Sequence, residues 1–353
     1  MSDAGERPLI LLLSSNLRRR YSEDILTALA LPREAVIQFR YGADYVAPPL
    51  QQKVANGSAI GQRVLLGFVA DYDSATNAFL LPVRFATVAE AECVADMFIF
   101  KLRVNDYANL DEYPASFAEI SEASRRTIGK LKESNSRYYP AVLKFPDLNV
   151  SGRGEPAQLW QAVASRLAQH PTFHASYFMR IDDPVHPTRG RSYTFDRQGR
   201  LNLSDLKPAK LPVSFYSEVY TESTNITLTC ATDGRFLRVS SDDKHDVALR
   251  YDSTEFWLQP NAASYDALTH ATIRLGPLEA SSTPAVTVRF PVVVKHSRLR
   301  LASRVLVSSG GAILVAAPAI LGGGSSLALR ITLAVIGSAL ISIATVVMAR
   351  NTT

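Results

Sequence analysis

The sequence predicts an α+β fold: a β-rich soluble part, made of a small mixed β unit and an antiparallel β-sandwich-like domain, followed by a C-terminal transmembrane α-hairpin. Three observations predict this fold. Short apolar or alternating runs with turn residues between them recur from residue 8 to residue 294, as in antiparallel sheets. A few segments have the 3.6-residue period of helices instead. Two long stretches near the end of the chain contain no charged residue, which is typical of membrane-spanning helices.

A chain of 353 residues is long enough for roughly two soluble domains and an anchor. We expect a β-rich α+β domain over residues 1–150. A helix and an antiparallel β-sandwich-like domain should follow over residues 151–298. The two-helix transmembrane hairpin should then occupy residues 299–353. The hydrophobic content of 47% is ordinary for a globular protein, so only the positions of the apolar residues reveal the tail.

The first domain is expected to begin with a buried strand over residues 8–14, with the sequence PLILLLS. A short helix from Glu23 to Leu31 should follow, and Pro32 should end it. Strands dominate up to residue 110, which favours a small β unit such as a partial barrel. The further strand-like runs are residues 35–41, 63–71, 78–85 and 97–104.

Helical periods mark the approach to the second domain. One covers residues 116–132, and residues 141–145 could return as a strand. A clearer helix is predicted from Pro156 to Gln169, because proline is favoured in the first turn of a helix. The apolar residues on one face of that helix are Leu159, Trp160, Val163 and Leu167.

From about residue 172 onward the pattern becomes strand after strand. Residues 226–230 and 236–239 flank the turn Asp233-Gly234, which predicts a β-hairpin. The clearest alternation of the chain covers residues 286–294. Runs that recur roughly every 8–15 residues with turns between them indicate an antiparallel sandwich.

The two uncharged stretches are residues 305–321 and 331–349, on either side of a glycine-rich turn. At about 1.5 Å per residue they span roughly 25 and 28 Å as helices, close to a bilayer core of about 30 Å. We therefore expect membrane helices at about 305–323 and 331–349. A pair of helices buried in a soluble core is the alternative.

The flanks of these stretches predict their orientation. Four basic residues precede the first stretch with no acid among them: Lys295, Arg298, Arg300 and Arg304. Arg350 follows the second stretch, and the turn offers Arg330. Positive residues favour the cytoplasmic side, so we expect a two-pass integral membrane protein with both termini in the cytoplasm. The four basic residues could also bind anionic lipid headgroups, or they could serve topology alone.

Small residues recur at four-residue spacing in both predicted helices and would allow close helix packing in lipid. This packing could join the two helices of one hairpin, or it could join copies into a homo-oligomer or a pore. The residues of the two stripes are Ser308, Ala312 and Ala316, then Ala334, Ser338 and Ser342.

Arg18, Arg19 and Arg20 follow the first strand and are the candidate anion or ligand site. Guanidinium groups beyond the end of a strand could hold the phosphate of a nucleotide or another ligand. Arg40 with Tyr41, or Arg84, would converge with them if the strands are neighbours. A solvated basic turn is the alternative.

Other candidate sites are weaker. A polar loop contains His170, His174, Asp182, Asp183 and His186, but Pro171 blocks a helical pairing of the first two histidines. The glycines of residues 151–154 could cradle an anion, or they could form a loop before a helix cap. No catalytic motif, metal site or cofactor fingerprint is recognised. Cys93 and Cys230 are expected as two buried free thiols, and one disulfide between them is the alternative.

These observations favour a membrane-anchored, non-enzymatic sensor or effector whose cytoplasmic part binds an unknown protein or small-molecule signal. The hairpin would contact the lipid bilayer, and oligomerisation or perturbation of the bilayer could follow. One alternative is a passive membrane tether or scaffold. Another is a membrane-bound enzyme that acts on a phosphorylated ligand near Arg18–Arg20. The net charge of +5 is too small to indicate nucleic acid binding.

Overall fold

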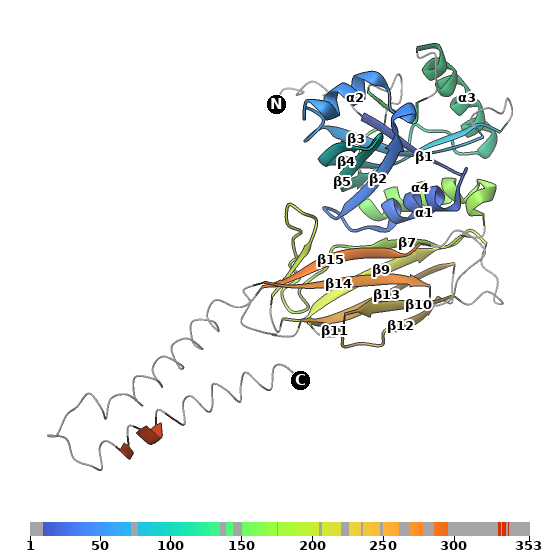
Figure 1. Ribbon diagram of the computed structural model, residues 1–353. Coiled ribbons are helices and arrows are strands. Elements are labelled where there is room, and N and C mark those ends of the chain that lie inside the picture. Colours follow the sequence, from blue (N-terminus) through green and yellow to red (C-terminus); the bar gives the residue numbers. More distant parts are fainter. Residues whose placement is uncertain are drawn as a thin grey trace, which may run out of the picture.

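The computed structural model describes most of residues 10–295 and six residues near the C-terminus. Over these residues the chain forms a curled six-stranded sheet and, below it in Figure 1, a sandwich of a five-stranded and a four-stranded sheet. Helices α1 and α4 lie between the two units (Figure 1). The described ranges are residues 10–71, 77–134, 139–143, 150–174, 176–204, 207–219, 226–233, 236–247, 250–260, 268–277, 286–295, 331–332, 334–336 and 338.

The six-stranded sheet has the strand order β2-β5-β4-β3-β1-β6. β1 and β3 run parallel, and the other neighbouring strands run antiparallel. The sheet curls until its edge strand meets β1: the Tyr41 hydroxyl of β2 donates a hydrogen bond of 3.1 Å to the carbonyl of Leu13. The strand bounds are β1 Ile10–Ser15, β2 Val36–Gly42, β3 Arg63–Ala70, β4 Phe79–Val94, β5 Met97–Tyr107 and β6 Ala141–Leu143.

The helices are close to the predicted positions, with two differences. α1 begins at Arg19, four residues before the predicted Glu23, because nothing in the local sequence marks its start: Arg18 offers no side-chain cap. α2 was not predicted, because its two prolines resemble a turn although proline fits the first turn of a helix. The bounds are α1 Arg19–Ala30, η1 Ala43–Tyr45, α2 Pro48–Ala55, α3 Phe117–Ser134, α4 Pro156–Ala168 and η2 Pro171–Phe173.

The sandwich is β-rich as predicted, and its sheets have the orders β12-β10-β14-β15-β8 and β11-β13-β9-β7. Neighbouring strands run antiparallel except β8 and β15, which run parallel. The strand bounds are β7 Phe178–Ile181, β8 Leu201–Ser204, β9 Ala209–Tyr216, β10 Ile226–Thr232, β11 Leu237–Val239, β12 Lys244–Val247, β13 Tyr251–Pro260, β14 Leu268–Pro277 and β15 Val288–Lys295.

The predicted β-hairpin around Asp233 is wrong. β10 pairs with β12 and β14 in one sheet, whereas β11 pairs with β13 in the other sheet. Alternation shows which side chains of a strand face the core, but it does not choose the partner strand. The chain therefore passes from one sheet to the other after Thr232 instead of folding back on β10.

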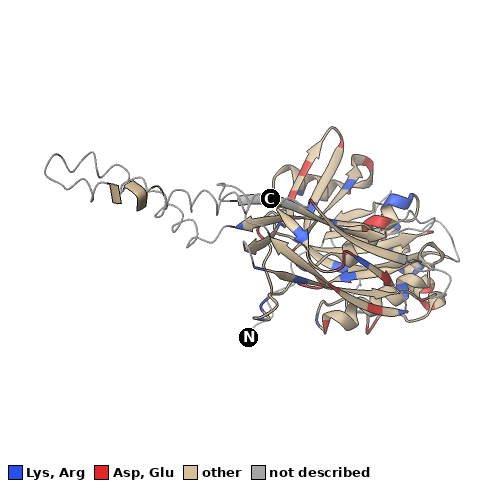
Figure 2. Ribbon diagram, turned by 90° about the horizontal axis from the view of Figure 1, so that it is seen from below, with Lys and Arg blue, Asp and Glu red and all other residues tan. Residues whose placement is uncertain are grey.

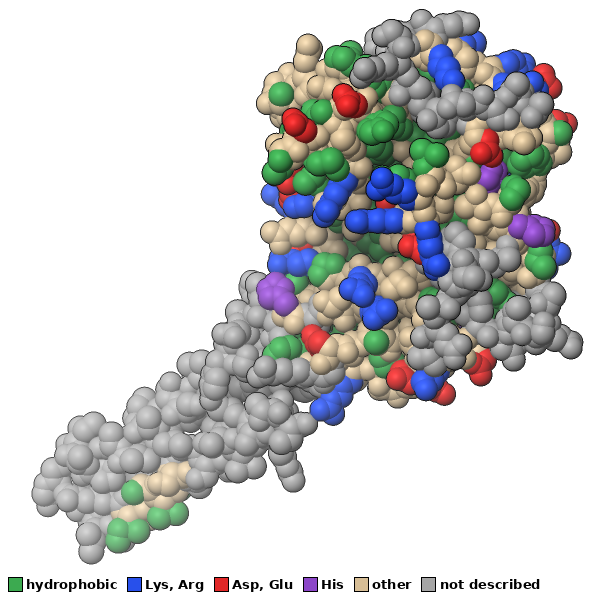
Figure 3. All heavy atoms as spheres, turned by 45° about the vertical axis from the view of Figure 1, so that its right-hand side comes forward, with side chains coloured by type: hydrophobic (Ala, Val, Ile, Leu, Met, Phe, Trp, Pro, Cys, Tyr) green, Lys and Arg blue, Asp and Glu red, His purple; other side chains and the backbone are tan. Residues whose placement is uncertain are grey.

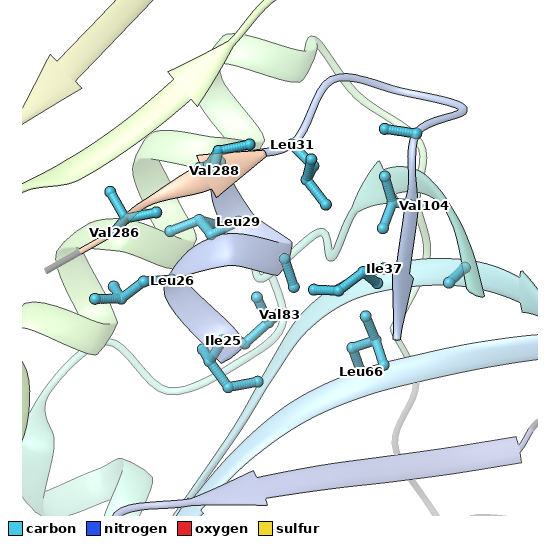
Figure 4. Close-up of a cluster of buried hydrophobic side chains, with 14 of the residues drawn as sticks. Ile25, Leu26, Leu29, Leu31, Ile37, Leu66, Val83, Val104, Val286 and Val288 are labelled. Carbon is cyan, nitrogen blue, oxygen red and sulfur yellow. The ribbon is translucent and has the colours of Figure 1, made fainter. Parts of the chain in front are cut away.

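We call the six-stranded sheet with its helices the first unit. One continuous apolar core joins the first unit to the sandwich, and side chains of α1 are part of it. In Figure 4, Ile25 of α1 lies on the side of the helix that faces Val83 and Leu66 of the six-stranded sheet. Val286 and Val288, from the sandwich, lie on the other side of the helix (Figure 4). α1 therefore buries side chains toward both units. Whether residues 1–150 and 151–298 fold as separate domains stays a prediction.

The cysteines differ from the expectation in one case. Cys230 is buried, and burial raises the pKa of its thiol to about 12. Cys93 is exposed, because β4 and β5 continue as a projecting hairpin whose turn contains Ala95 and Asp96 with positive φ. Residues 92–97, at the end of that hairpin, are all exposed.

The predicted transmembrane helices lie almost wholly outside the described residues. Among the residues that are described, no helix is both long and apolar enough to cross a membrane. Within the second predicted span, residues 331–332, 334–336 and 338 are helical.

Candidate ligand site at the start of α1

Short polar side chains connect the end of β1 to the first turn of α1. Ser14 Oγ donates a hydrogen bond of 2.8 Å to the carbonyl of Tyr21, and Ser22 Oγ donates one of 3.5 Å to the carbonyl of Ser15. Leu17 N–H donates to Ser15 Oγ at 3.4 Å. These bonds fix the position of the arginines that follow.

The predicted arginines form the start of α1. Arg18 is the N-cap residue, and its guanidinium lies 5.9 Å from the ring centroid of Tyr21. Arg19 Nε pairs with Glu23 Oε1 at 2.7 Å. The first turn contains no acid, so three cations stand where the helix dipole favours an anion. Each such placement costs about 0.3–1 kcal/mol at an exposed site, and a bound anion would remove this cost.

Arg20 and Arg40 act on the same carboxylate, Asp24. Burial raises the pKa of Asp24 to about 6, although the two arginines partly lower it and Glu23 raises it further. Arg40 of β2 therefore lies near Asp24, on the same part of the surface as Arg20. Tyr41 does not join these arginines, because its hydroxyl is bonded to β1. We call Arg18, Arg19, Arg20 and Arg40 the arginine cluster.

The charge of Asp24 should make stability depend on pH. Its pKa is about 6 in the folded protein against an ordinary 3.8, so the stabilisation from proton binding is complete below about pH 3.8 and is lost as pH rises through about 6. Asp24→Asn should therefore stabilise the protein near pH 8 by about 1 kcal/mol after solvent screening, and much less near pH 4. Thermal unfolding at the two pH values measures the difference.

Glu122→Gln is the control for Asp24→Asn, because Glu122 is exposed on α3 and makes only a long 3.8 Å pair with Arg126. It should change stability little at either pH. An equal gain from Asp24→Asn at both pH values would contradict an effect of the carboxylate charge.

Arg84 does not converge with the cluster, contrary to the suggestion from sequence. It is buried at the opposite end of α1, where its Nη1 donates to the carbonyls of Ala28 and Leu31 at 2.7 and 2.5 Å. A helix of twelve residues is about 18 Å long, so α1 separates the two sites. Arg84 closes the C-terminus of α1 and is unavailable to a ligand.

Figure 3 shows Lys and Arg side chains gathered around a hollow between the first unit and the sandwich. This is the level at which α1 lies in Figure 1. A cationic hollow of this kind can attract anions by electrostatic steering.

The histidines of the predicted polar loop do not form a metal site with its aspartates. His170 is buried against Phe68, Phe79 and Phe117, and its Nε2 lies 3.5 Å from Asp71. Asp182 instead pairs with Arg180 at 2.9 Å. Among the described residues, no group of three or more His, Cys, Asp or Glu side chains could hold a metal ion.

The glycine-containing loop before α4 is a helix cap. Glu155 is the N-cap residue, and its Oε2 accepts a hydrogen bond of 2.9 Å from the N–H of Gln158. This bond lowers the pKa of Glu155. A carboxylate thus occupies the place that an anion would take.

The predicted lipid and packing residues are only partly described. Lys295 is exposed at the end of β15, and Ala334 and Ser338 are helical. The remaining residues of these predictions lie outside the described ranges: Arg298, Arg300, Arg304, Ser308, Ala312, Ala316 and Ser342.

Sequence reasoning missed Asp24 as a member of the site. The spacing of four residues between Arg20 and Asp24 on a helix was the available signal, because such residues are neighbours on its surface. The helix was predicted to begin at Glu23, so that spacing was not recognised.

The fold and site define an α+β protein with a curled mixed sheet, a β-sandwich and an arginine cluster at the start of α1. No family model matches the chain, and no curated protein matches it. A solved structure of domains 4 and 5 of the S-layer protein SbsC is similar at 14% identity and a TM-score of 0.19, covering 33% of this chain and 55% of that chain. Salmonella alpha-2-macroglobulin reacted with methylamine is similar at 8% identity and a TM-score of 0.20, covering 75% of this chain and 15% of that chain. TM-scores this low support no conclusion about fold or function.

Proposed function

We propose that this chain is a membrane-anchored, non-enzymatic sensor or effector that binds a phosphorylated or otherwise anionic signal at the arginine cluster. The hairpin of residues 305–323 and 331–349 anchors it in the bilayer as a two-pass protein with both termini in the cytoplasm. The small-residue stripes let the two helices pack closely, and the same stripes allow copies to associate.

The observation that carries the anchor is a helix with solvent-facing apolar side chains. Ile331, Val335 and Ile336 are 55%, 61% and 46% exposed, and the helical pieces stand apart from the sandwich (Figure 1). Water is a poor environment for such a surface, and lipid is a good one. The stretch of residues 331–349 that contains them is uncharged, which also favours a lipid environment.

The charge of the arginine cluster supports an anionic signal. The cluster contains four arginines, and the two carboxylates that interact with them are Glu23 and Asp24, which leaves two positive charges in excess. A phosphate would bring both charge and acceptor oxygens to these arginines.

The test uses the full chain in phosphatidylcholine vesicles. It should remain with the vesicles after a carbonate wash, and inorganic pyrophosphate should raise the Tm of the retained protein. At roughly a hundred times its Kd, a ligand that binds only the folded state contributes about 2.7 kcal/mol, or a rise of about 4 °C for a chain of this size. Arg20→Ala and Arg40→Ala should each reduce this rise.

Arg126→Ala is the matched control, because Arg126 is an exposed helical arginine away from the cluster. It should keep the full response to pyrophosphate. Release of the chain by carbonate would contradict the anchor. A response that persists in both Arg20→Ala and Arg40→Ala would contradict the ligand site. Retention without any response to anions would leave a passive tether as the function.

A further inference from the structure

The chain leaves the β-sandwich at one end, which we call the exit end. Lys295, the last residue of β15, lies opposite Ser204, the last residue of the parallel strand β8. Residues 205–208 join Ser204 to Ala209 of β9 and span at most about 18 Å. β9 therefore also begins at the exit end, in the other sheet. The ten residues from Lys295 to Val305, where the first uncharged stretch begins, span at most about 35 Å.

Positive side chains gather at the exit end. Lys210 of β9 and Val185 exchange two backbone hydrogen bonds of 2.9 Å. β7 and the residues after it run antiparallel to β9, so the turn that follows Val185 lies where β9 begins. Figure 2 shows basic segments at ends of the sandwich strands. The exposed basic residues at this end are Arg189, Arg191, Lys207 and Lys295.

A tryptophan faces outward near the same end. Trp257 of β13 lies opposite Lys210, and its side chain is 36% exposed. Lys210 Nζ lies 4.9 Å from the ring centroid of Trp257 and 2.7 Å from Glu255. Tyr251, at the other end of β13, accepts a hydrogen bond from Gln161 of α4. Six residues of strand, about 20 Å, separate Trp257 from that contact. Trp257 therefore lies well away from α4.

We propose that the exit end of the sandwich rests on the bilayer and binds anionic lipid headgroups, with Trp257 in the interfacial layer. The inference rests on the proposed anchor, which holds this end within reach of the membrane. Arg189, Arg191 and Lys207 complement the negative surface of a cytoplasmic leaflet. An amphipathic indole beside a lysine suits the headgroup region, where tryptophan is enriched.

The two tryptophans of the chain make this contact measurable. The full chain with Trp160→Phe keeps Trp257 as its single fluorophore. In vesicles of brominated lipid that contain phosphatidylglycerol, the emission of Trp257 should fall about twofold relative to unbrominated vesicles, because bromine quenches nearby indoles in the interface. The fall should be smaller without phosphatidylglycerol.

Two controls accompany this measurement. Trp257→Phe keeps Trp160, which is only 3% exposed between α4 and β7, so its emission should not respond to bromine. The native chain checks the result if Trp160→Phe unfolds, since bromine should quench only the part of its emission that comes from Trp257. Replacing both Arg189 and Arg191 with alanine should remove the dependence on phosphatidylglycerol, whereas Arg126→Ala should not.

Quenching of Trp257 and retention after the carbonate wash together distinguish the headgroup contact from the membrane anchor. Retention without quenching of Trp257 would overturn the headgroup contact and leave the anchor. Quenching before the wash, followed by release, would leave the contact and overturn the anchor. Equal quenching with and without phosphatidylglycerol would overturn the recognition of anionic headgroups.

Discussion

Arg84→Met is expected to destabilise the folded protein by about 3–5 kcal/mol, the usual effect of breaking a buried charged network. Arg84 is fully buried in β4 and stacks on Tyr107, with the guanidinium carbon 4.3 Å from the ring centroid. Its Nη1 donates to the carbonyls of Ala28 and Leu31, and its Nε donates to Asn105 at 2.9 Å.

The reason for this large effect is the C-terminus of α1. The last carbonyls of a helix lack partners within the helix, and burial without a partner costs about 1–3 kcal/mol for each group. Arg84 serves two of these carbonyls, and Tyr107 donates to a third, that of Leu29, at 3.1 Å. Methionine fills a similar volume but donates no hydrogen bond. Urea unfolding followed by the fluorescence of buried Trp160 measures the loss.

Arg33→Met is the matched control, because Arg33 is exposed and pairs with Asp106 only at 3.5 Å. It should cost less than about 1 kcal/mol. The loss of stability in Arg84→Lys should fall between the two, since one ammonium cannot reach the carbonyls of Ala28, Leu31 and Asn105 together. Equal midpoints for Arg84→Met and Arg33→Met would contradict the capping role.

Gly199→Ala should destabilise the protein by about 3 kcal/mol, because it combines backbone strain with a clash. The φ angle of Gly199 is +71°, a conformation that disfavours a side chain. A Cβ at this position would lie 2.4 Å from Cγ2 and 2.9 Å from the backbone nitrogen of Val36. Arg103 holds the same contact, since its Nη2 donates to the carbonyl of Arg197 at 2.8 Å.

Gly190→Ala separates strain from clash. Gly190 has a φ angle of +59°, but a Cβ there would meet no atom within 4 Å. It should cost about 1 kcal/mol, from the backbone alone. Denaturant midpoints of the two variants measure how much more stability Gly199→Ala loses than Gly190→Ala. That extra loss comes from the clash with Val36, where the sandwich packs against β2. Equal effects would mean that this contact does not stabilise the fold.

Local sequence predicted most elements because their signals are local. β3 and the helices α3 and α4 begin and end near the predicted residues. β4 and β5 begin as predicted but continue to Val94 and Tyr107, beyond the predicted ends at residues 85 and 104. Apolar alternation and helical period specify the face that each element buries. The start of α1 and the whole of α2 were harder, because one lacks a capping residue and the other begins with two prolines.

The sequence predicted only part of the candidate site. Three consecutive arginines after a strand identified the start of α1 as a basic site. Asp24 joins it because α1 begins at Arg19, which places Asp24 one helical turn after Arg20. Arg40 comes near Asp24 only because β2 returns alongside α1. The contact between Trp257 and Lys210 likewise depends on the register of β13 with β9.

The sequence by itself determined the β-rich α+β character of residues 10–295 and the position of the uncharged tail. Both follow from patterns within a few neighbouring residues. Only the tertiary structure decided that β10 and β11 belong to different sheets, and that Arg84 closes α1 rather than joining the arginine cluster. The physical reason is that strand partners and buried hydrogen bonds are chosen by residues distant in the chain, which local periodicity does not specify.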